Sequence, residues 1–121
     1  MTVWRLPLSY DRPPLTANQR LHWSHRSKVT AAICDEIVLR VRSMHIPRLA
    51  GRPRVTLYYF PPDNRRRDVD NLVPTSKACV DGLRYAGVLV DDDPAHVDHR
   101  MPVILPKQEK AGLTLMIVGA P

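Results

Sequence analysis

The sequence predicts a small α/β domain (α+β), in which a mixed sheet of about four strands packs against two main helices. Three observations predict it. A helical apolar repeat lies early in the chain, a β-branched and aromatic run lies near its middle, and a second helical segment precedes short extended segments. At 121 residues and 44% hydrophobic composition, the chain has the size and make-up of one domain, residues 1–121.

The first two elements are a short strand and a long helix. A strand over residues 3–8 ends at residues 11–14, because proline cannot donate to a sheet ladder. Apolar residues then recur every three or four positions, at Val29, Ile33, Ile37, Val41 and Met44. This spacing predicts a helix from residue 24 or 27 to residue 45, which the following proline ends.

The remaining elements follow from composition and from helix punctuation. Residues 54–60 are rich in β-branched and aromatic types and predict a strand that Pro61 and Pro62 end. A second helix is expected over residues 72–86, with Pro74 in its first turn and Gly87 at its end. Residues 88–90, 95–105 and 113–118 are expected to be extended, and a turn at residues 107–112 joins the last pair.

The charge of the protein is positive and unevenly distributed. Eighteen lysines and arginines outnumber twelve acids, which gives a net charge of +6 and a pI near 9.8. Residues 12–54 hold nine of the basic residues, among them Arg26 and Lys28, whereas residues 61–100 hold eight of the acids. A basic chain of this size is a candidate for binding a polyanion such as DNA.

Several functional classes are disfavoured. No apolar stretch approaches the ~20 residues that span a bilayer, and the first residues do not lead into a signal-peptide core. No glycine-rich phosphate loop is present. The two cysteines, Cys34 and Cys79, lack metal-ligand spacing. We therefore expect a cytoplasmic protein with two reduced thiols, no membrane partner and no nucleotide cofactor.

The segment between the central strand and the second helix contains three arginines and two aspartates, Arg65, Arg66, Arg67, Asp68 and Asp70. If the backbone stays extended through Val69, both carboxylates point to one side, with Cα atoms ~6.5 to 7 Å apart. Carboxylates that close stay ionised when a cation or water separates them, and arginines suit phosphate. The alternative is a solvated turn in which Asp70 or Asn71 caps the helix.

The second helix is expected to gather its polar residues, Asp70, Lys77, Asp81 and Arg84, on one face. Lys77 lies two turns from Asp70, where an ammonium could hold a phosphate or stabilise developing negative charge. Lys77 and Asp81 also have the i,i+4 spacing of an ordinary surface pair, and this is the interpretation that we favour for Asp81.

A third acidic group, Asp91, Asp92 and Asp93, follows residues 88–90. An extended chain sends Asp91 and Asp93 to one face and Asp92 to the other, so the pattern leaves open which of them completes a cluster. Carboxylates without a cysteine or histidine cluster suit Mg²⁺ or Mn²⁺. A flexible acidic loop is the alternative.

The five histidines form no zinc pattern. His22 and His25, near the start of the first helix, suit capping or contact with phosphate better than metal binding. His96 and His99 are expected to be surface residues of an extended segment.

Four spaced segments resemble the RusA family of Holliday junction resolvases, which is common in phages and prophages. They are residues 65–72 (RRRDVDNL), 77–83 (KACVDGL), 86–87 (AG) and 91–92 (DD). The combination is specific, whereas the flanking elements are merely compatible with the family. The interval from Asn71 to Lys77 is longer than in the family's pattern and contains Pro74.

The resemblance implies a homodimeric, Mg²⁺-dependent endonuclease that resolves four-way DNA junctions by paired nicks, with Mn²⁺ as a substitute. By position, its catalytic residues correspond to Asp68, Asp70, Asp92 and Lys77, and its metal ligands to the three aspartates, with Asp91 in reserve. Water would attack phosphorus in line while one or two ions stabilise the attacking and leaving oxygens. The residues expected to contact DNA are Arg26, Lys28, Arg65, Arg66, Arg67 and Lys77.

Three other functions are open at this point. A flap or fork nuclease would use the same metal centre on other branched DNA. A non-catalytic basic DNA-binding protein would have only structural acids, so Asp70→Asn would change nothing. A calcium-stabilised interaction domain is disfavoured, because the sequence lacks the spaced oxygen ligands and central glycine of a calcium loop.

Overall fold

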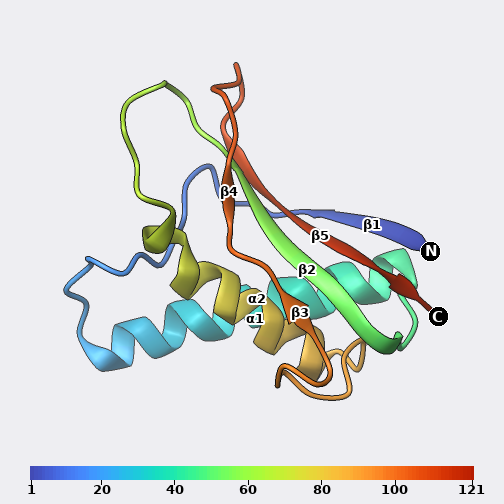
Figure 1. Ribbon diagram of the computed structural model, residues 1–121. Helices are drawn as coiled ribbons and strands as arrows, with labels where there is room; N and C mark the ends of the chain where they lie inside the picture. Colours follow the sequence, from blue (N-terminus) through green and yellow to red (C-terminus); the bar gives the residue numbers. More distant parts are fainter.

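A mixed sheet of five strands forms one layer of the protein, and two helices form the other (Figure 1). The computed structural model describes residues 1–121. The strands are β1 (Thr2–Pro7), β2 (Ala50–Phe60), β3 (Asp98–His99), β4 (Val103–Ile104) and β5 (Gly112–Ala120). The helices are α1 (Trp23–Met44) and α2 (Val73–Tyr85), and a short 3₁₀ helix, η1 (Val69–Leu72), precedes α2. The predicted α+β class is confirmed, with one strand more than expected.

β5 and β2 form the centre of the sheet. β5 pairs antiparallel with both β1 and β2, and β3 and β4 pair parallel with the other edge of β2. β3 and β4 act as one interrupted edge strand, because Pro102 between them has no N–H for the ladder. Backbone bonds from Arg100 to Val55 and from Leu105 to Tyr59 extend this edge.

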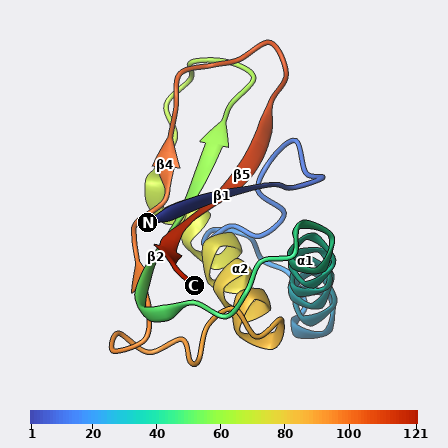
Figure 2. The ribbon, with the colours of Figure 1, turned by 90° about the vertical axis from the view of Figure 1, so that its right-hand side faces the viewer.

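One expectation about the extended segments is wrong. Residues 88–90 form a bend, not a strand. Val88 and Leu89 are buried, and the Val88 carbonyl accepts a bond from the Leu49 N–H at 3.0 Å, so the apolar run serves the core outside any ladder. The last two strands, β4 and β5, do not pair with each other. They lie on opposite edges of β2, and their connection crosses the end of that strand (Figure 2).

The long helix α1 begins and ends close to the predicted positions. The His22 side chain accepts a bond from the Ser24 N–H at 3.2 Å, which confirms a capping role for His22. His45 takes a left-handed conformation, with φ 53°, directly after the last turn. The buried residues of α1 are Ile33, Cys34, Ile37 and Val41. The helical repeat seen in the sequence therefore marks the face that packs.

The helix α2 packs closely against α1, and Gly82 makes this possible. A Cβ at residue 82 would lie 2.8 Å from Ile37 Cβ and 3.2 Å from Cys34 Cα. Pro74 lies in the first turn, and Gly87, with φ +83°, follows the helix as predicted. The apolar face of α2 is buried, and its buried residues include Cys79.

Both helices lie on the same side of the sheet, and α2 lies nearer to it than α1 (Figure 2). One hydrophobic core of 22 residues joins the two layers. Its sheet residues include Leu6, Val55, Leu57, Leu115 and Ile117, which are fully buried. The polar ends of α2 and the loops around it are left at the surface, where the predicted site residues lie.

Candidate functional site

Lys77 lies on the exposed face of α2 and bridges two aspartates. Its Nζ donates to Asp81 Oδ1 at 2.8 Å, one helical turn along, and to Asp92 Oδ2 at 2.7 Å, in the loop after α2. The predicted pairing of Lys77 with Asp81 is confirmed. The fold also brings together Lys77 and Asp92, two of the four residues predicted to be catalytic.

These ion pairs hold both partners in their charged forms. The hydrogen bond from Lys77, followed by a contribution from Asp91, lowers the pKa of Asp92 to about 2. Partial burial alone would lower the pKa of Lys77, but the bonds and charges of Asp81 and Asp92 outweigh it and raise that pKa. Asp92 in the loop and Lys77 on the helix therefore both stay ionised at neutral pH, side by side.

No three of the predicted metal ligands have ligand atoms within 4.8 Å of one another. Asp68 precedes η1 and Asp70 lies in η1, whereas Asp91 and Asp92 belong to the loop after α2. One group of three acidic or histidine residues has ligand atoms within 4.8 Å of one another, and it comprises Asp91, Asp93 and His96. Of the predicted ligands, this group contains Asp91 alone, because Asp92 turns to Lys77.

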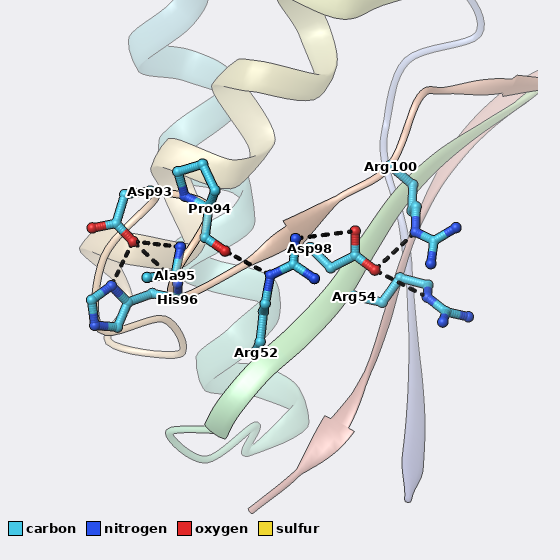
Figure 3. A network of polar contacts seen from close by, with 8 residues as sticks. All are labelled: Arg52, Arg54, Asp93, Pro94, Ala95, His96, Asp98 and Arg100. Carbon is cyan, nitrogen blue, oxygen red and sulfur yellow. Dashed lines mark hydrogen bonds and ion pairs between the residues drawn. The ribbon is translucent and has the colours of Figure 1, made fainter.

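Asp93 and His96 of this group are brought together by a tight turn (Figure 3). Asp93 Oδ1 accepts bonds from the N–H groups of Ala95 and His96, both at 3.1 Å, and lies 2.6 Å from His96 Nδ1. The expectation that His96 belongs to an extended segment is therefore wrong. Aspartate followed by Pro94 is a common start of a type I turn, and this signal could have placed His96 beside Asp93.

The segment that carries Asp68 and Asp70 is not extended throughout. Asp68 has φ −93° and ψ 130°, but Val69 begins η1, which contains Asp70. The premise that strand alternation points both carboxylates to one side is wrong, because a 3₁₀ helix has three residues per turn. No side chain caps α2, so the alternative role of Asp70 or Asn71 as its cap is also wrong.

An arginine-rich cleft of ≈ 860 Å³ lies beside Asp68. Its walls come from the loops after β1 and β2, from η1 and from β4. The charged residues of its lining are Arg12, Arg65, Arg66, Arg67 and Asp68. Four guanidinium groups against one carboxylate make the cleft cationic, and guanidinium groups bind phosphate in a bidentate manner.

The arginines of this cleft are not equivalent. Arg67 donates to Asp63 Oδ1 at 2.8 Å and to two backbone carbonyls at 3.0 Å, and it lies over the Tyr59 ring. Its side chain is only 14% exposed, so it holds the loop in place. Arg65 is 79% exposed with a long contact of 3.9 Å to Asp63, and Arg66 has no ion pair. Arg65 and Arg66, together with the exposed Arg12, which forms no ion pair, are therefore free to meet a ligand.

His99, on β3, reaches across to α2. Its Nε2 lies 2.6 Å from Ser76 Oγ. Burial of the ring lowers its pKa, the charge of Lys77 lowers it further, and Asp81 opposes this shift. His99 is a surface strand residue as predicted, and its ring lies near enough to Lys77 to sense its charge.

Arg26 and Lys28 lie on α1, outside the arginine-rich cleft. Arg26 lines a groove of ≈ 610 Å³ between the two helices, together with Trp23 and Tyr85. Lys28 is exposed on the same helix and forms no ion pair. Neither of these two predicted DNA contacts lines the arginine-rich cleft that contains Arg65 and Arg66.

Comparison with known proteins adds no relative. No family model matches the chain, and no curated protein matches it. None of its helices has the length and apolar character that crossing a membrane requires. The fold and the site together define a small α+β protein with a carboxylate and lysine cluster on α2 and a cationic cleft beyond the start of that helix.

Proposed function

We propose that the protein is a divalent-metal-dependent endonuclease of the RusA type, which resolves four-way DNA junctions by paired nicks. The observation that carries this proposal is the contact of Lys77 with Asp92, 2.7 Å apart. A lysine and an aspartate that the resemblance assigns to catalysis, fifteen positions apart, meet beside a second group of carboxylates.

The residues proposed to hold Mg²⁺ or Mn²⁺ are Asp68, Asp70, Asp92 and, in reserve, Asp91. The acidic loop favours such an ion, since ligand atoms of Asp91, Asp93 and His96 lie within 4.8 Å of one another. Two carboxylates and one imidazole are a mixed donor set that does not select Mg²⁺ by itself. A bound ion would polarise the scissile phosphate and activate the attacking water.

The side chains of the protein would position the DNA. Lys77 would exchange one of its aspartate contacts for an oxygen of the scissile phosphate, because an ammonium has three donors and little geometric demand. Arg65 and Arg66 would bind flanking phosphates in the cleft beside Asp68. These contacts are to the backbone, so they would position DNA without reading its sequence.

The partners proposed are branched DNA and a second copy of the protein. A four-way junction requires two matched cuts, and a twofold homodimer presents two copies of one site. Trp23, Leu39 and Tyr85 are exposed apolar side chains of the helical layer that a second copy would cover. A resolvase encoded by a phage or prophage would act in the bacterial cytoplasm.

The test compares wild type and Asp70→Asn on a labelled four-way junction, a flap and a linear duplex, with Mg²⁺ and with chelator. We expect paired nicks in the junction for wild type, and binding without cutting for the variant. Glu109→Gln, an exposed acid without an ion pair, is the control and should cut like wild type. Equal cutting of the flap would favour the alternative, a general branched-DNA nuclease.

A non-catalytic basic DNA-binding protein is the second candidate. The ion pair between Asp92 and Lys77 favours this non-catalytic candidate, because a paired carboxylate is less available to a metal ion. This candidate predicts no cutting of any substrate by wild type, and unchanged binding by Asp70→Asn. The same experiment therefore separates the two functions.

A further inference from the structure

Three arginines surround one aspartate at the edge of the sheet (Figure 3). Asp98, on β3, lies in register with Arg54 on β2. Its carboxylate oxygens lie 2.8 Å from Arg100 Nε, 3.6 Å from Arg54 Nε and 3.9 Å from Arg52 Nη2. None of its residues forms an ion pair with Lys77 or lines the cleft beside Asp68.

The cluster has more positive charge than its own aspartate can neutralise. The hydrogen bond from Arg100, together with the charges of the three arginines, lowers the pKa of Asp98 and keeps it ionised. Three guanidinium groups, which stay protonated, then leave a net charge of +2. The arginine side chains are 51–54% exposed and that of Asp98 is 20% exposed. The excess charge therefore faces the solvent.

The backbone fixes the positions of these arginines. Arg52 and Arg54 belong to β2, and the N–H of Arg100 donates to the Val55 carbonyl at 2.9 Å, which continues the ladder of the β2 edge. Arg52 Nε also donates to the Pro94 carbonyl at 2.6 Å. Like charges held this close repel one another, and an anion above the cluster would relieve the repulsion. Guanidinium groups that are already positioned lose little freedom on binding.

The position of the cluster favours a long polyanion as its ligand. The bond from Arg52 to Pro94 ties it to the loop that contains Asp91, Asp93 and His96. The cleft with Arg65 and Arg66 lies toward the opposite end of β2, where Tyr59 lines it. Arg54 and Tyr59 are five positions apart, so ~16 Å of strand separates the two cationic groups. A ligand that meets both must be long and repeatedly charged, as a nucleic-acid backbone is.

We propose that Arg52, Arg54 and Arg100, held by Asp98, bind backbone phosphates of DNA at a contact separate from the cleft. This inference rests on the proposed function only in taking DNA as the partner, and it requires no catalysis. It predicts that the cluster contributes to affinity and to salt dependence, not to the cleavage chemistry.

The experiment measures binding to a fluorescent four-way junction over a range of salt, in chelator, so that no cutting occurs. The variant is Arg54→Gln with Arg100→Gln, which leaves Arg52 to pair with Asp98. We expect weaker binding and a slope of log K against log salt that is smaller by about 2, since each phosphate contact contributes about 1. The control is Arg40→Gln with Arg42→Gln on α1, which removes the same charge and should leave the slope within about 0.5.

Equal salt slopes for the two double variants would overturn the inference, because the loss of positive charge would then weaken DNA binding equally at either position. The same Arg54→Gln, Arg100→Gln variant is also tested on vesicles that contain phosphatidylserine. If it loses binding to these vesicles but binds DNA like wild type, the inference is overturned and the cluster is assigned to lipid binding. Wild-type cleavage with Mg²⁺ is scored separately. A protein that binds through the cluster but never cuts would refute the proposed nuclease and support this contact.

Discussion

Lys77 Nζ and Asp92 Oδ2 lie 2.7 Å apart, and this contact closes the loop after α2 back onto the helix. The two residues stand fifteen positions apart in the sequence. Lys77 also holds Asp81, so one ammonium ties the helix surface to the acidic loop. The position of the Asp91 to Asp93 triplet relative to α2 is therefore set in part by a single lysine.

This contact predicts a specific dependence of stability on pH. The ordinary aspartate pKa of 3.8 is lowered to about 2 in the folded protein, so the contribution of Asp92 is present above pH 3.8 and is lost as the pH falls toward 2. The melting temperature of wild type should exceed that of Asp92→Asn at pH 6, and the gap should close between pH 4 and 2. A gap that stays constant over this range would contradict the pairing.

Close packing of the helices predicts a large effect at Gly82. Gly82→Ala would place a Cβ 2.8 Å from Ile37 Cβ and 3.2 Å from the α1 backbone at Cys34, so the helices must separate. We expect a loss of ~1 to 3 kcal/mol in the free energy of unfolding, measured with urea. Gly112→Ala, where the nearest atom lies 3.9 Å away, is the control and should change it by less than ~0.5 kcal/mol. Equal effects would refute the packing explanation.

The environment of His99 predicts a coupling to Lys77. Burial and the charge of Lys77 lower the pKa of His99, so Lys77→Met should raise that pKa toward 6.5. The histidine ring signals, followed by NMR from pH 4 to 8, would measure this shift. Lys28→Met, on α1, should leave the His99 titration unchanged. If neither substitution changes the pKa of His99, the charge of Lys77 does not influence the ring and the prediction is wrong.

The thiols should be protected by the fold. Cys34 and Cys79 are both free and buried, and burial raises the pKa of each. Modification of Cys79, which is fully buried in the core, by a thiol reagent at pH 8 should be roughly 10³-fold slower in buffer than in denaturant, because it requires opening of the core. Rapid labelling of Cys79 in the native protein would contradict this burial.

The sequence predicts those elements whose signals are local. The repeat through Ile33, Ile37 and Val41 predicts α1, and the β-branched run before Pro61 predicts most of β2. The polar face of α2 was also predictable, since Lys77 and Asp81 pair as their spacing requires. Helical and strand periodicities indicate which side of an element is buried, and burial of that side stabilises these elements.

The remainder depends on contacts between distant segments. Val88 and Leu89 look like a strand because they are apolar, but a bend places them in the core. No local signal indicates that Lys77 selects Asp92 and leaves Asp91 near Asp93 and His96. The short helix η1 likewise removes the extended geometry assumed for Asp68 and Asp70. Which carboxylates bind an ion stays a prediction.

The central claim is that the acids near Lys77 support metal-dependent cleavage of branched DNA. The most direct measurement is the single-turnover rate of nicking of a four-way junction by wild type and Asp92→Asn, with Glu109→Gln as the control. We predict nicking by wild type and the control in Mg²⁺, none in chelator, and a rate for Asp92→Asn lower by roughly a hundredfold or more. Cutting that persists in chelator, or an equal rate for Asp92→Asn, would contradict the claim.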